Sequence, residues 1–170
     1  PTQVDAEPAV AALLAEAAGE DEEAAVRAAR ALQAVLDTGD VSEAQQHNLV
    51  SELCSLVLAA GSPRVRRALL DALAASSPFV GLSLVLELLL DHRDALDDDA
   101  TATLLRALGR MLEVAEAADP TARGQVALLL RVEAPGPVLD ALAASPVQAV
   151  ATEAHAVRRR IDRLAPVLDE

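Results

Sequence analysis

The chain has 170 residues, of which 52% are hydrophobic and 1% aromatic, and its formal net charge is −13. We expect one domain over residues 1–170, with residues 1–5 flexible, because a chain of this length and apolar content can bury a core. The acidic balance disfavours nucleic acid and anionic membranes, which need clustered cations, and the scarcity of aromatic residues disfavours ligands that bind by stacking.

The residue types predict an all-helical protein. Alanine and leucine, both strong helix formers, dominate the sequence, whereas strand-forming Tyr and Trp are absent. The single cysteine, Cys54, cannot form an internal disulfide bond, which favours a reducing compartment. The longest apolar run, residues 82–90, is interrupted by Glu87 and is too short to span a bilayer. We therefore expect a cytoplasmic protein that is stabilised by packing.

Helix start signals are frequent along the chain, because Ser or Asp followed by Pro supplies an N-cap oxygen and a proline suited to the first helical position. Such pairs stand at Ser62-Pro63, Ser77-Pro78, Asp119-Pro120 and Ser145-Pro146. Gly19, Gly39 and Gly61 fit helix ends. Together with the apolar periodicity, these signals predict nine helices, over residues 8–18, 21–37, 41–59, 62–75, 78–92, 98–117, 120–132, 136–144 and 146–164.

The connections between these predicted helices are short, so consecutive helices must run antiparallel. The expected fold class is all-α, with about four helix pairs. Two architectures satisfy this description: a short α-solenoid of stacked helical hairpins and a closed helical bundle.

An apolar residue followed by arginine recurs near the start of four helical segments. The pairs are Val26-Arg27, Val65-Arg66, Ala122-Arg123 and Val157-Arg158. The first and last intervals between them match the length of one helical hairpin, which favours the solenoid. In a stack of hairpins, the arginine stem can pack between helices while its guanidinium reaches a carboxylate of the neighbouring repeat, with Asp37 and Asp71 available.

These pairs resemble the second helix of a HEAT repeat, in which Val-Arg follows an acidic or turn residue and precedes small residues and leucine at helical spacing. The first two pairs match best, whereas Ala122 and Gly124 depart from the pattern and Val157 lacks the preceding turn. The resemblance to HEAT and armadillo repeats implies an extended superhelical scaffold that binds proteins or peptides along a concave face. It gives Arg27, Arg66 and Arg123 structural roles.

Two groups of exposed arginines are the candidate partner-binding residues. Arg64 and Arg67 share one face of the helix predicted over residues 62–75, where they could bind an acidic peptide. The second group, Arg158, Arg159 and Arg163, lies near the C-terminal end of the last predicted helix. A phosphate or an acidic partner could bind there, although cations also stabilise a helix C-terminus.

Metal-binding and catalytic patterns are weak. His47 and Cys54 lie two turns apart on one predicted helix, about 10 Å along its axis, which is too far to share a zinc ion, and leucines around Cys54 place it in the core. Asp97, Asp98 and Asp99 suit the N-terminus of the next helix better than a calcium loop. We find no glycine-rich phosphate loop and no Ser-His-Asp arrangement, and we expect no enzyme, metal or cofactor.

The predicted function is that of a non-catalytic scaffold, adaptor or assembly factor that binds a partner peptide or helix on one face of a helical stack. The excess of acid favours a basic protein partner. Two alternatives remain open: a closed bundle that holds an apolar small molecule as a carrier, sensor or enzyme, and an oligomerisation domain. Residues 82–90 would be central to a bundle, because they are apolar on nearly all sides.

Overall fold

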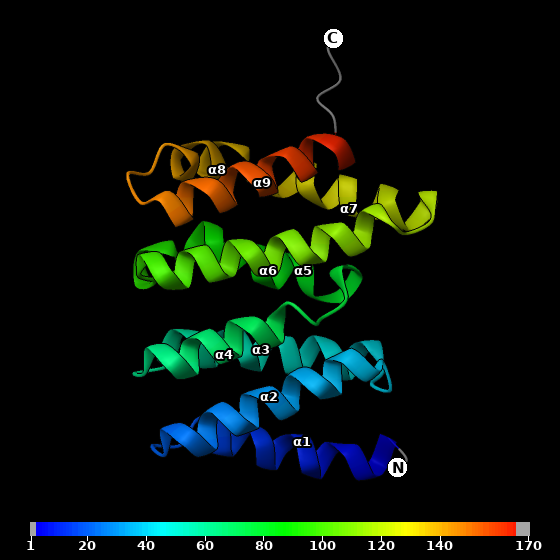
Figure 1. The fold of residues 1–170 in the computed structure, drawn as a ribbon. Helices are drawn as coiled ribbons and strands as arrows, with labels where there is room; N and C mark the ends of the chain where they lie inside the picture. The colour runs from blue at the N-terminus through cyan, green and yellow to red at the C-terminus, as the bar shows by residue number, and fades with distance from the viewer. Residues whose placement is uncertain (1–2, 166–170) are drawn as a thin grey trace. The chain divides into compact units, whose positions relative to one another are not determined.

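The computed structural model describes residues 3–165, with side chains from residue 7 onward. All regular structure in this range is helical (Figure 1). The elements are α1 (Gln3–Ala17), α2 (Glu22–Thr38), α3 (Glu43–Ala59), α4 (Pro63–Leu73), α5 (Pro78–Asp91), the short 3-10 helix η1 (Arg93–Ala95), α6 (Asp98–Glu116), α7 (Pro120–Glu133), α8 (Gly136–Ala143) and α9 (Gln148–Leu164). Of the segment 1–5 expected to be flexible, residues 1 and 2 lie outside the described range and residue 3 begins α1.

All nine predicted α-helices are present, and their ends lie within two residues of the predicted positions except at the start of α1. The sequence predicts a start at Pro8, but Pro8 lies inside α1. A proline lacks the backbone N–H, so it costs α1 one hydrogen bond close to the helix start. Residues 3–7 are helical nonetheless, because a proline this close to the helix start interrupts the backbone hydrogen bonding at one position only.

Three of the four Ser-Pro or Asp-Pro pairs begin a helix as predicted. Ser62, Ser77 and Asp119 are N-caps whose side chains each accept a hydrogen bond from a backbone N–H of the first turn. The prediction is wrong at Ser145, because α9 begins two residues after Pro146 and the Ser145 hydroxyl accepts a hydrogen bond from the N–H of Val147. At this position the Ser-Pro pair forms a turn instead of a cap.

The first of two compact units comprises residues 1–76. In this unit, α1 and α2 form one antiparallel hairpin, α3 and α4 form the next, and α2 packs against α4 (Figure 1). The buried stripe of α2 contains Ala25, Ala28, Ala29, Leu32 and Leu36. Small alanine side chains permit close helix packing, and each fully buried leucine contributes about 1.5–3 kcal/mol relative to an exposed one. The four helices therefore form two layers joined through their second helices.

The second unit comprises residues 77–170, of which the structure describes 77–165. Here α5 packs against α6, α6 packs along α9, and α8 also contacts α9. Eleven residues of α6 are buried, so this helix is the main core element of the unit. The segment 82–90 is buried on most sides, as its composition predicts, with Ser83 and Glu87 exposed.

A break in the helical backbone at Ala134 and Pro135 separates α7 from α8. Ala134 has a φ of 48° in the left-handed region, and the following Pro135 disfavours helical backbone at the preceding residue. The sequence Ala-Pro-Gly-Pro thus ends α7 and starts α8.

Each unit consists of stacked helical hairpins. That residues 1–170 form a single repeat domain stays a prediction.

Candidate functional site

The N-terminus of α4 positions Arg64 and Arg67, the first of the two predicted partner-binding groups. Ser62 caps the helix and Pro63 occupies its first position, which fixes the rotation of α4. Val65 and Leu69 then point into the core, whereas Arg64 and Arg67 are exposed. The local sequence therefore places both guanidinium groups on the surface of the first unit.

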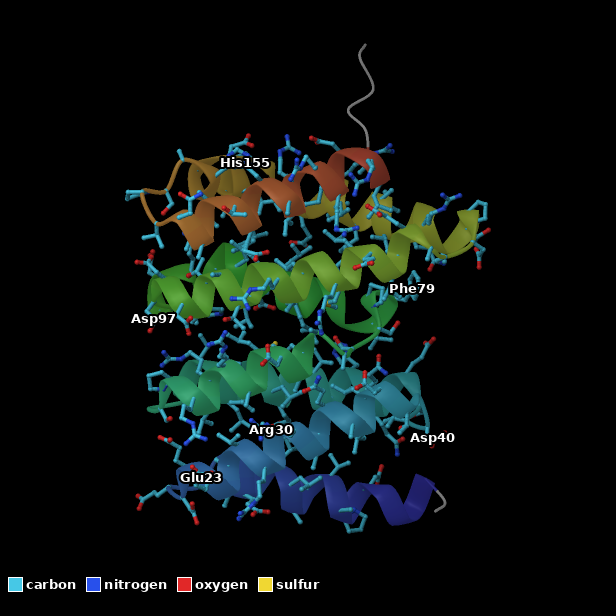
Figure 2. All side chains as sticks on the ribbon, in the orientation of Figure 1. Glu23, Arg30, Asp40, Phe79, Asp97 and His155 are labelled. Carbon is cyan, nitrogen blue, oxygen red and sulfur yellow. The ribbon has the colours of Figure 1, made fainter. Side chains whose placement is uncertain are left out.

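Arg64 and Arg67 line a shallow groove between α2 and α4, with a volume of about 170 Å³. A third arginine, Arg30, enters this groove from α2, and Figure 2 labels it on that helix. Val26 and Ala68 supply apolar surface, and Asp71 is the one carboxylate in the lining. The packing of α2 on α4 thus brings together three guanidinium groups on a unit in which carboxylates outnumber arginines.

Arg64 is already held by two carboxylates of α2. Its Nη1 lies 2.9 Å from Glu22 Oε1 and 2.7 Å from Glu23 Oε1. The Ser62 hydroxyl also donates to Glu22, over 2.8 Å. This hydrogen bond from Ser62, followed by the one from Arg64, lowers the pKa of Glu22, and the hydrogen bonds to Glu23 and Glu22 raise the pKa of Arg64.

By contrast, Arg30 and Arg67 form no ion pair with any described residue. Both are exposed on the groove. A guanidinium group presents a planar fork of donors that matches a carboxylate, so two unpaired arginines on adjacent helices can bind an acidic side chain from another molecule.

Arg66 lies between these residues in the sequence but faces the protein. Its Nη2 donates to the Ala60 carbonyl over 2.7 Å and its Nε to the Val57 carbonyl over 3.4 Å. These are carbonyls at the C-terminal end of α3, which lack intrahelical partners. Arg66 therefore links the end of α3 to the start of α4.

The other two arginines predicted to be structural differ from Arg66. Arg27 on α2 and Arg123 on α7 are exposed, and neither forms an ion pair with a described residue. The Val-Arg pattern alone does not distinguish these environments, because the position of the arginine depends on which helix end lies within reach.

The three predicted arginines of α9 do not form one site. Arg158 pairs with Asp140 of α8 and with Asp162, while Arg163 pairs with Glu116 of α6. Arg159 is exposed and forms no ion pair within the described range. Sequence reasoning missed Arg160, whose guanidinium lies 3.1 Å from Glu116 and 3.8 Å from Glu113. This network mainly joins α9 to its neighbours.

Four further expectations from the sequence concern metal binding, Cys54, the acidic residues before α6 and membrane spans. Residues 3–165 contain no group of three or more His, Cys, Asp or Glu side chains that could hold a metal ion. Cys54 is half-buried, not fully buried as expected. Asp97 caps α6, as predicted, by accepting a hydrogen bond from the N–H of Ala100 over 2.8 Å. Over the same residues, no helix has both the length and the apolar content needed to cross a membrane.

Among solved structures, a designed armadillo repeat protein is similar to this chain, with a TM-score of 0.52 and 18% sequence identity. The similarity covers 88% of this chain and 63% of the designed protein. No protein-family model and no curated protein matches the sequence. The fold is therefore an armadillo-like α-helical repeat, an α-solenoid of stacked hairpins as the HEAT resemblance predicts, and the closed-bundle alternative is not favoured.

Proposed function

We propose that this protein is a non-catalytic interaction module that binds an acidic segment of a partner protein across α2 and α4. The armadillo-like fold supports a protein-binding role, because stacked repeats present long surfaces built from successive helices. The observation that carries the proposal is the groove that contains Arg30 and Arg67, both exposed and neither in an ion pair with a described residue.

The net charge of −13 does not prevent such binding. At physiological ionic strength the Debye length is about 8 Å, so carboxylates farther from the groove are largely screened. Close to the groove, Glu22 and Glu23 are paired with Arg64. An acidic side chain that reaches the groove therefore meets mainly the positive charge of Arg30 and Arg67, opposed by Asp71.

Within the groove, we assign direct contacts to Arg30 and Arg67 and a supporting role to Arg64. Arg64 would have to exchange its contacts with Glu22 and Glu23 to bind a partner fully, which reduces its net contribution. In the second unit, Arg159 is the corresponding candidate, because Arg158 and Arg163 are held in ion pairs with α8 and α6.

The proposal is tested by fluorescence anisotropy with a labelled glutamate-rich peptide. We expect the double variant R30E/R67E to bind at least about tenfold more weakly, equivalent to about 1.4 kcal/mol. Binding to the wild type should weaken as salt is added, since exposed charge pairs are screened.

A matched control is the double variant R27E/R123E. It changes the net charge by the same amount, at two exposed arginines that do not line this groove. We expect it to retain most of the affinity. Equal losses in the two double variants, or no peptide binding by the wild type, would overturn the assignment of this groove.

A further inference from the structure

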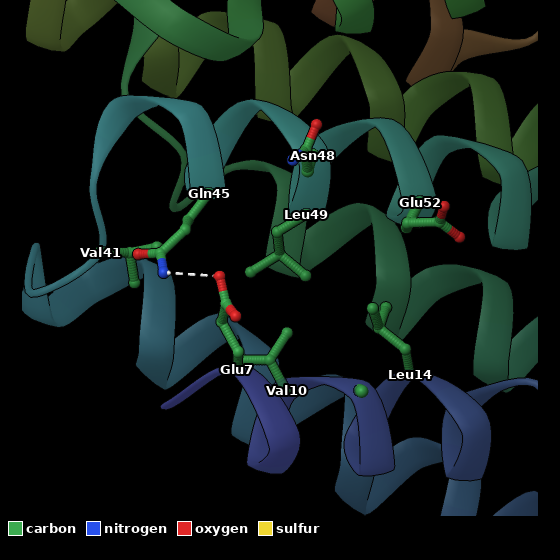
Figure 3. A pocket seen from close by; sticks show the side chains of 9 residues that line it. Glu7, Val10, Leu14, Val41, Gln45, Asn48, Leu49 and Glu52 are labelled. Carbon is green, nitrogen blue, oxygen red and sulfur yellow. Dashed lines mark hydrogen bonds between the residues drawn. The ribbon is translucent and has the colours of Figure 1, made fainter. Parts of the chain in front are cut away.

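A second groove of the first unit lies between α1 and α3, and its lining is mostly apolar. Figure 3 shows this groove from close by. Its volume is about 210 Å³. From α1, the residues at positions i, i+3, i+4 and i+7 line it: Glu7, Val10, Ala11 and Leu14. This spacing is one face of a helix over two turns. The groove thus has the length of a short helical segment.

The wall formed by α3 has the same periodicity. Gln45, Asn48, Leu49 and Glu52 occupy positions i, i+3, i+4 and i+7 of that helix. Leu49 is buried, whereas Val10 and Leu14 opposite are half-buried and retain surface that a partner can cover. The exposed apolar surface of the groove therefore comes mainly from α1, and the centre of the α3 wall combines Asn48 with the buried Leu49.

A capping box fixes one end of this groove. The Ser42 hydroxyl accepts from the Gln45 N–H over 3.2 Å, and the Gln45 side-chain oxygen accepts from the Ser42 N–H over 3.1 Å. The same side chain donates from Nε2 to Glu7 Oε1 over 3.2 Å. The cap that starts α3 thereby orients the carboxylate of Glu7.

A second carboxylate, that of Glu52, marks the opposite end. Figure 3 shows Glu7 beside Gln45 at one end and Glu52 near Leu14 at the other. Glu52 forms no hydrogen bond or ion pair with any described residue. Seven residues of helix correspond to about 10 Å, so the two carboxylates frame the apolar centre at a separation of roughly two helical turns.

We propose that this α1–α3 groove binds an amphipathic helix of a partner protein, in which leucine-like side chains lie between two basic residues at positions i and i+7. The apolar side chains cover Val10 and Leu14, and the basic residues pair with Glu7 and Glu52. Helix-in-groove recognition uses this combination of apolar anchors and flanking charge.

The occupant is a different protein, because a second copy docked through the same groove would place Glu7 and Glu52 against identical carboxylates. The groove is also independent of the arginine groove between α2 and α4, since the two share no lining residue. Their chemistry is opposite: one presents unpaired guanidinium groups and the other presents carboxylates around an apolar centre.

The probe for this proposal is a labelled, end-blocked, alanine-rich helical peptide with lysine at positions i and i+7 and leucine at i+3 and i+4. We expect it to bind the wild type and to bind E7R/E52R at least about tenfold more weakly. The control E16R/D37R has the same change in net charge, at two exposed carboxylates outside the groove, and should retain the affinity. R30E/R67E should also bind the peptide normally.

Two further peptides test the recognition itself. Replacing both leucines by serine, or moving the lysines to the opposite face of the peptide helix, should abolish most of the binding. The proposal is overturned if E7R/E52R and E16R/D37R lose affinity equally, or if the displaced-lysine peptide binds as well as the original. It is also overturned if light scattering shows a concentration-dependent dimer of the wild type that E7R/E52R abolishes, because the occupant is then a second copy.

Discussion

Replacing Arg66 by alanine is the sharpest test of how these hairpins are held together. The substitution removes two hydrogen bonds to carbonyls at the end of α3, of 2.7 Å and 3.4 Å. A hydrogen bond from a charged donor contributes about 1.5–3 kcal/mol, and the longer bond is at the limit of useful geometry. We therefore expect R66A to lower the free energy of unfolding by about 2 kcal/mol, mainly through the bond to Ala60.

Arg67 provides the matched control, because R67A deletes the same atoms from the neighbouring, exposed position. Surface substitutions of this kind usually change stability by less than about 0.5 kcal/mol. Urea unfolding should be followed by far-ultraviolet circular dichroism, since the sequence has no Trp or Tyr for fluorescence. With a slope of about 2 kcal/mol per molar urea, R66A should lower the midpoint by about 1 M. Equal midpoints for R66A and R67A would refute the structural role of Arg66.

Two other predictions concern backbone conformation and charge. G39A should destabilise the protein by about 1 kcal/mol, because Gly39 ends α2 with a φ of 69° in the left-handed region. The control G61A should be neutral or slightly stabilising, because the added Cβ meets no atom within 4 Å. Urea midpoints that fall equally in the two variants would contradict this prediction. R64Q should raise the pKa of Glu22 part of the way to its ordinary value, the hydrogen bond from Ser62 remaining. Because the folded-state pKa of Glu22 is lowered, its hydrogen bonds and ion pair stabilise the protein above the ordinary pKa of glutamate, and this contribution is lost as the pH falls through the folded-state pKa. If NMR titration finds the same pKa of Glu22 in R64Q and in the wild type, the pairing of Glu22 with Arg64 is contradicted.

The helices could be predicted from the sequence because their signals are local. A capping side chain, a proline at the first helical position and an apolar stripe all lie within one or two turns, and they identified the starts of α4, α5 and α7. The failure at Ser145 has the same origin: a Ser-Pro pair is equally compatible with a turn, and only the chain that follows decides between the two.

The candidate site was predictable only in part. The exposure of Arg64 and Arg67 follows from the apolar stripe of α4, so the sequence identified both. Arg30 was missed because its place in the groove depends on how α2 packs against α4. The same limit applies to the repeated Val-Arg pairs, since Arg66 reaches the end of α3 while Arg27, in the same motif, lies in solvent.

The sequence also posed a question about the partner, because a strongly acidic chain favours a basic partner while its most conspicuous exposed arginines favour an acidic one. The first unit offers a physical resolution, since both grooves are local. Over a Debye length of about 8 Å, each ligand responds mainly to the charges in its own groove. One unit can then bind two segments of opposite charge. Added salt should lower the affinity for the acidic peptide more than the affinity for the amphipathic helix, because the leucines of that helix bind through apolar contact.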